Sequence, residues 1–185
     1  IEGFFKALDN IMDLAIRQLY YRYQVCCELK GKDLPFVIGQ KLYLGSEDVG
    51  PEDSIEPCLK HATLSVGFIG LAECLTALVG ENHAESEAAW ELGYKIIEHM
   101  RKKTDEAIDR YRLNYTLMAT PAEGLSSRFT RLDQKLYGVI AGVTDKEFYT
   151  NSFHVPVWQD IGMARKLEIE GPFHKLTNGA HISYV

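Results

Sequence analysis

Asn114-Tyr-Thr-Leu-Met-Ala-Thr-Pro-Ala-Glu-Gly-Leu-Ser-Ser-Arg128 is the stretch that decides the fold of this chain. It opens with an apolar run, Asn114 to Ala119, of the kind found in buried strands. Thr120-Pro121 predicts a turn, and the helical pattern that follows ends at Gly138. A strand that leads directly into a helix is the unit from which parallel sheets are built.

A second strand–turn–helix unit lies upstream, at Thr63–Ile69 and Leu71–Val79. Gly67, inside that strand, predicts a position where other backbone approaches closely. Amphipathic patterns at 3–30 and 83–112 predict a long helix before each strand. This alternation predicts an α/β architecture with parallel strands, arranged as an open sheet or as part of a barrel.

The rest of the chain carries weaker signals and no sign of a second domain, so 1–185 is treated as a single segment. The further expectations are a glycine-rich loop with at most one short strand at 32–53, a short helix at 55–62 capped by Ser54, an extended stretch at 147–157, a partly helical stretch at 160–176 and a final strand at 180–185.

Composition excludes several classes of function. The net charge of −6 disfavours binding to nucleic acid or to an anionic membrane, because both need a basic surface. There is no apolar run of about 18 residues that would predict a membrane span. The cysteines lack C-x-x-C spacing, so the sequence predicts no metal site and reduced thiols, as in the cytoplasm; they are Cys26, Cys27, Cys58 and Cys74.

The turn after Ala119 is the best candidate for a binding site. Ligands of α/β proteins gather at the carboxyl ends of strands, and a helix N-terminus there offers unpaired N–H groups and a positive dipole end to a phosphate. Gly124 would let a ligand approach the backbone. The predicted phosphate-binding residues are Thr120, Ala122, Glu123, Gly124, Leu125 and Ser126.

The same residues also allow an interpretation without a ligand. Thr120-Pro-Ala-Glu123 has the pattern of a capping box with proline in the first helical position. Thr120 would then accept a hydrogen bond from the N–H of residue 123, and Glu123 would reach back to residue 120. The cap and the phosphate site are compatible if the helix begins near Ser126.

Polar groups interrupt the extended stretch Tyr149-Thr-Asn-Ser-Phe-His-Val-Pro156. Asn151, Ser152 and His154 could line a cleft as hydrogen-bonding groups. The alternative is a loop that enters an edge strand, which Pro156 would end. Glu168 and Glu170 are expected to be solvated rather than catalytic.

Four runs together resemble the anaerobic (class III) ribonucleoside-triphosphate reductases, and they follow the family's order over essentially the whole chain. They are Ser65-Val-Gly-Phe-Ile-Gly-Leu-Ala-Glu73, Thr116-Leu-Met-Ala-Thr-Pro-Ala-Glu-Gly-Leu-Ser126, Tyr149-Thr-Asn-Ser-Phe-His-Val-Pro156 and Leu176-Thr-Asn-Gly-Ala-His-Ile-Ser-Tyr184.

The resemblance implies part of the ten-stranded α/β barrel that ribonucleotide reductases share with glycyl radical enzymes. It implies reduction of ribonucleoside triphosphates to deoxyribonucleoside triphosphates by glycyl and thiyl radicals in the full-length protein. It also implies formate as reductant, a zinc site, ATP and dNTP effectors, a homodimer, and an activase that uses S-adenosylmethionine and an iron–sulfur cluster to install the radical.

Mapped onto this chain, the resemblance favours the phosphate role of Thr120 to Ser126 and places Asn151, Ser152 and His154 in the barrel lining. None of the four cysteines matches a family motif. The radical-loop cysteine aligns upstream of Ile1, and the zinc cysteines and glycyl loop align downstream of Val185. We therefore expect no catalytic residue in this segment, and we expect the isolated segment to be inactive.

Two other functions stay open at this point. The long helices could serve a non-catalytic folding or binding module. The chain could also be the barrel part of another glycyl radical enzyme, in which Thr120 to Gly124 would have no phosphate to hold.

Overall fold

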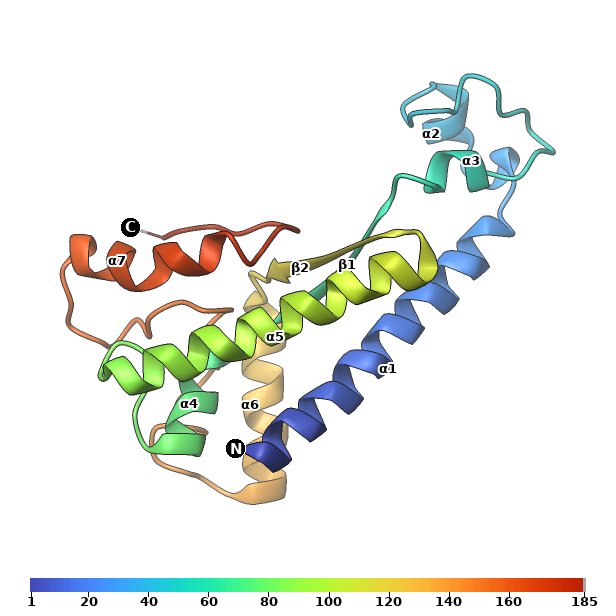
Figure 1. The fold of residues 1–185 in the computed structure, drawn as a ribbon. Coiled ribbons are helices and arrows are strands. Elements are labelled where there is room, and N and C mark those ends of the chain that lie inside the picture. The colour runs from blue at the N-terminus through green and yellow to red at the C-terminus, as the bar shows by residue number, and fades with distance from the viewer. Residues whose placement is uncertain (185) are drawn as a thin grey trace.

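The computed structural model describes residues 1–184. Figure 1 shows two short strands near the centre, with the long helices α1 (Glu2–Cys27) and α5 (Glu87–Tyr111) running beside them. A small lobe stands apart at the far end of α1. It contains a 3-10 turn at Gly31–Asp33 and the helices α2 (Pro35–Gly39) and α3 (Glu56–Leu59).

The two predicted strands pair in parallel. β1 (Thr63–Phe68) and β2 (Asn114–Ala119) lie in register from one end to the other, and α4 (Leu71–Val79) and α5 connect them. The predicted α/β architecture is confirmed. The predicted final strand is wrong within the described residues: Ala180 makes a single parallel bridge to Met118, and Val185 lies outside the described part.

One face of the sheet is apolar and covered by helices. Leu64 and Val66 of β1 and Tyr115 and Leu117 of β2 are buried in the same core as residues of α1 and α5. The Tyr115 hydroxyl also donates to the carbonyl of Ile16 in α1, at 3.0 Å. Each such fully buried side chain contributes about 1.5–3 kcal/mol relative to exposure, so this layer holds the sheet against both helices.

The opposite face carries small and polar residues. The hydroxyls of Ser65 and Thr116 lie 2.9 Å apart, in a hydrogen bond across the two strands. A Cβ at Gly67 would overlap the hydroxyl of Thr120, so the close approach exists, but the predicted approach of backbone is wrong. The neighbour is a side chain rather than backbone, and Gly67 is therefore what lets Thr120 lie against β1.

The expected extended stretch at 147–157 is wrong. Asn151 makes one antiparallel bridge to Ile69, but Ser152 has φ +46°, which breaks an extended course. Residues 32–53, where at most one short strand was expected, contain no strand in the described structure; a 3-10 turn and α2 lie there instead. The other helices are α6 (Glu123–Tyr137) and α7 (Met163–His174).

Aromatic packing joins α7 to the rest of the core. Phe173 of α7 is fully buried and stacks on Phe153, with ring centroids 5.4 Å apart. The indole N–H of Trp90 in α5 donates to the carbonyl of Ile169 at 3.0 Å. These contacts fix the loop before α7 relative to the sheet.

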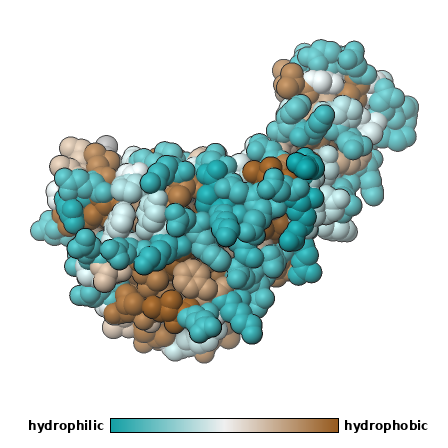
Figure 2. All heavy atoms as spheres, in the orientation of Figure 1, coloured by the Kyte–Doolittle hydropathy of each residue, from teal (hydrophilic) through white to brown (hydrophobic). Residues whose placement is uncertain are grey.

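Apolar side chains remain exposed along α6 and the loop after it, including Leu125, Phe129, Leu136, Val139 and Ile140. Figure 2 shows apolar atoms gathered at the lower part of the molecule, where Figure 1 places α4, the start of α1 and α6. Contiguous apolar patches of this kind mark surfaces that pack against other protein.

His83 makes the stability of this fold depend on pH. Its side chain is 2% exposed, Nε2 donates to the carbonyl of Phe153 at 2.8 Å, and burial lowers its pKa to about 4. The unfolded chain therefore binds a proton between pH 6.5 and 4 that the folded chain does not, and stability falls as the pH falls through that window. We expect His83 to account for a loss of about 2 kcal/mol between pH 7 and pH 5.

Urea unfolding of the wild type and of His83→Gln at both pH values measures this contribution. Glutamine keeps a donor for Phe153 but does not titrate, so the variant should lose less stability on acidification. Equal losses in the two proteins would contradict the prediction. Glu73 and Glu170 titrate in both, and their effect cancels in the comparison.

Gly67→Ala should destabilise the fold because the new methyl group meets Thr120, whereas Gly124→Ala places a methyl group where nothing lies within 4 Å. We expect a cost of about 1–3 kcal/mol for the first change and less than about 0.5 kcal/mol for the second. Denaturant midpoints measure both. Matching midpoints for the two variants would show that Thr120 yields without cost.

Candidate functional site

The candidate site lies where β1 and β2 end. Because the strands are parallel, their carboxyl ends share one edge of the sheet, and the residues after each strand meet there. α6 begins shortly after β2, with Ala122 as its N-cap residue. The loop around Asn151 lies against the end of β1, through its bridge to Ile69.

The predicted capping box is wrong. No side chain of residues 1–184 caps α6, and the helix begins at Glu123 itself rather than at Pro121. The hydroxyl of Thr120 instead lies 3.4 Å from the carbonyl of Met118, next to Gly67. The packing of Thr120 against β1 therefore takes its side chain away from the helix.

Three backbone amides at the start of α6 are free. The first N–H to bond within the helix is that of Ser126, which donates to the carbonyl of Ala122 at 2.9 Å. Those of Glu123, Gly124 and Leu125 have no hydrogen-bond acceptor in the described part of the chain. They point out of the helix N-terminus, at the positive end of the helix dipole, as in sites that bind anions.

The other predicted residues have different surroundings. The N–H of Ala122 is occupied, because it donates to Oδ1 of Asn151 at 3.0 Å. Ser126 is buried and its hydroxyl donates to the carbonyl of Glu123 at 3.0 Å. Thr120, Ala122 and Leu125 line a shallow cavity of about 330 Å³ beside the end of β1. The contact between Asn151 and Ala122 joins the two predicted segments, which sequence spacing did not show.

A buried carboxylate holds the loop that carries Asn151. Oε1 of Glu73 accepts both the N–H of Thr150, at 2.9 Å, and its hydroxyl, at 2.6 Å. The N–H of Gly70 donates to the carbonyl of Thr150 at 2.7 Å. Burial raises the pKa of Glu73, and the hydrogen bonds from Thr150 oppose that rise. Sequence spacing does not show this contact, because Glu73 and Thr150 lie 77 residues apart.

Asn151 and His154 line a cavity of about 420 Å³, but Ser152 does not. Ser152 is 1% exposed, and its hydroxyl has no hydrogen-bond partner within residues 1–184. The structure thus brings two of the three predicted polar residues to one cavity, next to the start of α6.

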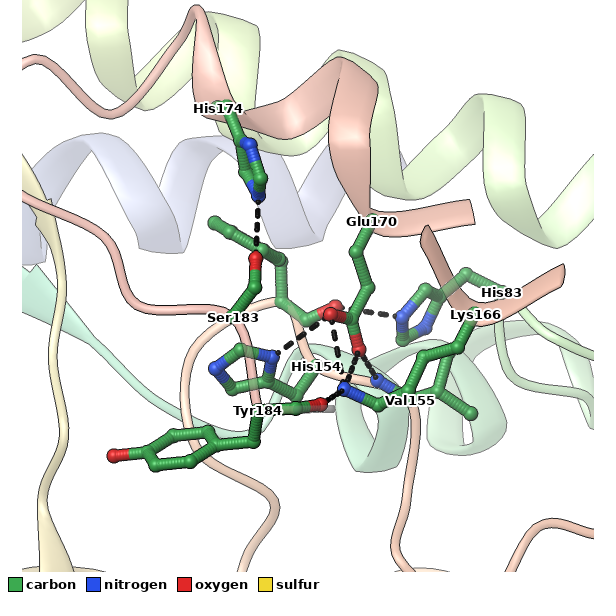
Figure 3. Close-up of polar contacts among 9 residues, drawn as sticks. His83, His154, Val155, Lys166, Glu170, His174, Ser183 and Tyr184 are labelled. Carbon is green, nitrogen blue, oxygen red and sulfur yellow. Dashed lines mark hydrogen bonds and ion pairs between the residues drawn. The ribbon is translucent and has the colours of Figure 1, made fainter. Parts of the chain in front are cut away.

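His154 stands beside a second buried carboxylate, Glu170 of α7 (Figure 3). Glu170 is 0% exposed, so the expectation that it is solvated is wrong. Its oxygens accept from the N–H of Val155 at 2.8 Å and from Nζ of Lys166 at 3.0 Å, and Nδ1 of His154 lies 3.1 Å away. Burial opposes ionisation of Glu170, but these three contacts outweigh it and lower its pKa.

No group of three or more His, Cys, Asp or Glu residues within 1–184 could hold a metal ion. The four cysteines are unpaired, and Cys58 is buried. None of the described helices combines the length and apolar character needed to cross a bilayer. The chemistry that these residues offer is hydrogen bonding to a polar or anionic ligand.

Comparison with known proteins gives a consistent family. The family described as anaerobic ribonucleoside-triphosphate reductase matches residues 1–185. The anaerobic ribonucleoside-triphosphate reductase of Salmonella typhimurium is 34% identical over 188 residues, which cover 98% of this chain and 26% of that protein. The protein of the same name from Enterobacteria phage T4 is 33% identical, over 100% of this chain and 29% of its own length.

Solved structures agree in fold. The anaerobic ribonucleotide reductase from Thermotoga maritima with MES in the active site matches all of this chain and 29% of its own, with a TM-score of 0.67 and 16% identity. The curated relatives are thus longer proteins, of which this chain spans 26–29%. Since the family's model matches the whole sequence, the chain belongs to the anaerobic ribonucleoside-triphosphate reductase family.

Proposed function

We propose that this chain is a segment of the catalytic barrel of an anaerobic ribonucleoside-triphosphate reductase, and that the start of α6 binds the phosphates of the substrate. The observation that carries the proposal is the set of free amides of Glu123, Gly124 and Leu125 at the carboxyl edge of a parallel sheet. Main-chain N–H groups at such an edge suit a triphosphate, because they are fixed donors that need no reorganisation on binding.

Two further features support this assignment. Glu123 is the acid of the first helical turn, but its side chain does not cap the helix, so it leaves the amides open. Asn151 accepts a hydrogen bond from the N–H of Ala122, so this donor is occupied. The donors left for a ligand are the N–H groups of Glu123, Gly124 and Leu125. The chain also matches a family whose members are named ribonucleoside-triphosphate reductases, and a ribonucleoside triphosphate is a ligand with phosphates.

The reduction itself belongs, in this proposal, to the rest of the longer protein. The described residues provide no cluster for a metal ion, and the resemblance assigns no family role to any of the four cysteines. The glycyl and thiyl radicals, the zinc, the effector sites, the formate reductant and the contact with the activase would therefore lie elsewhere in a cytoplasmic homodimer. The apolar surface along α6 would pack against the missing part of the barrel.

Gly124→Leu in the full-length enzyme tests the phosphate site. Nothing lies within 4 Å of a Cβ at Gly124, so a larger side chain there starts in open space, beside the free amides. Loss of one charge-assisted hydrogen bond corresponds to roughly a 10- to 100-fold rise in the substrate KM. Steady-state kinetics with CTP measures the change.

Gly3→Leu is the matched control, because a Cβ at Gly3 in α1 also meets nothing within 4 Å and lies in a different element. It should leave KM unchanged. If Gly124→Leu also left KM unchanged while the protein stayed folded, the free amides would not be the phosphate site.

A further inference from the structure

We infer that His154 contacts the substrate, with Nε2 accepting a hydrogen bond from a hydroxyl group of the ribose, and that Glu170 is the residue that positions it. The inference rests on the proposed function, because it names a second contact for the same nucleotide. It starts from a cavity that the phosphate site does not use.

The cavity of about 420 Å³ is of the size that small-molecule ligands occupy. Its walls are mixed. Pro156, Val157 and Ile161 give apolar surface, whereas Asn151, His154 and Gln159 give hydrogen-bonding groups. Amide and imidazole groups beside apolar walls suit a polar ring such as a sugar, which presents hydroxyls at its edge and C–H groups on its faces.

Glu170 determines which nitrogen of His154 carries the proton. Nδ1 lies 3.1 Å from Oε2 of Glu170, although the contact is too far out of line to count as a regular hydrogen bond. A nitrogen this close to a buried carboxylate carries the hydrogen, and in neutral imidazole the other nitrogen is then an acceptor. Figure 3 shows the second ring nitrogen turned away from Glu170.

The carboxylate is itself fixed, so it can hold the imidazole in one orientation. Lys166 approaches both of its oxygens, at 3.0 and 3.1 Å, and Val155 donates at 2.8 Å. Lys166 also donates to the carbonyl of Tyr184 at 2.6 Å, and the ring of Tyr184 meets that of His154 edge-on. Lys166 therefore pairs with the charge of Glu170 and helps to hold the carboxylate beside the imidazole.

The cavity adjoins the proposed phosphate site. Asn151 lines it and also accepts the N–H of Ala122 at the start of α6. One nucleotide can thus present phosphates to α6 and its sugar to His154. A site that is built to accept a hydroxyl discriminates against an analogue without that hydroxyl, because its own acceptor is then left unpaired.

The test compares CTP with 2′-deoxy-CTP and 3′-deoxy-CTP in the full-length enzyme. KM is measured for CTP, and the inhibition constants are measured for the two analogues. In the wild type, one analogue should bind about 10-fold more weakly than CTP, because it lacks the contacted hydroxyl. In His154→Leu, the binding of CTP should weaken by a similar factor, whereas the binding of that analogue should not change. The preference for CTP over the analogue should therefore disappear.

Two further variants separate contact from folding. His154→Gln retains an acceptor and should recover part of the preference. His174→Leu is the control: it removes a half-buried histidine of α7 that does not line the cavity, and the preference for CTP over the analogue should stay intact.

The inference would be overturned if His154→Leu weakened the binding of CTP and of both analogues equally, or if it left the preference for CTP over the analogue unchanged. His154 would then be a structural residue. The Gly124→Leu result keeps the two proposals apart. If Gly124→Leu raises KM and His154→Leu keeps the preference, only the sugar contact fails. If Gly124→Leu has no effect, the phosphate site fails whatever His154 does.

Discussion

The parallel pairing of β1 with β2 is the constraint on which the rest of the structure depends. Parallel strands end at the same edge, so α4 and α6, the helices that follow them, both begin at that edge. The buried contacts of Leu64, Val66, Tyr115 and Leu117 with the helices maintain this arrangement. Everything proposed about ligand binding takes place at that one edge.

Two buried carboxylates connect the edge to a loop that has no regular structure of its own. Glu73 holds Thr150, and Glu170 holds Val155 and faces His154. A buried carboxylate is costly unless its oxygens accept hydrogen bonds. The loop donates to one oxygen of each carboxylate and Lys166 donates to the other oxygen of Glu170, whereas Oε2 of Glu73 has no partner within residues 1–184. The loop is therefore held by polar contacts with two helices rather than by a strand ladder, and this keeps Asn151 and His154 in fixed positions.

The free amides of α6 follow from a competition between packing and local capping. Thr120 has the right type and spacing for a cap, but the absence of a side chain at Gly67 lets it lie against β1 instead. Within residues 1–184, the helix then starts without a side-chain cap and with three unbonded N–H groups. Local sequence rules predict that Thr120 caps the helix. The tertiary contact of Thr120 with Gly67 prevents this and leaves the three N–H groups available to a ligand.

The sequence by itself determined the two strands, their parallel pairing, most helices and the family. Apolar periodicity and the order of motifs can be read along the chain, because they do not depend on which distant residues meet. The sequence also marked Gly67, Gly124, Asn151 and His154. Only the tertiary structure decided that Asn151 meets Ala122 and that Glu170 is buried beside His154. Those pairs lie 29 and 16 residues apart, and at such separations the fold, not local propensity, decides which polar groups meet and which lose their contact with water.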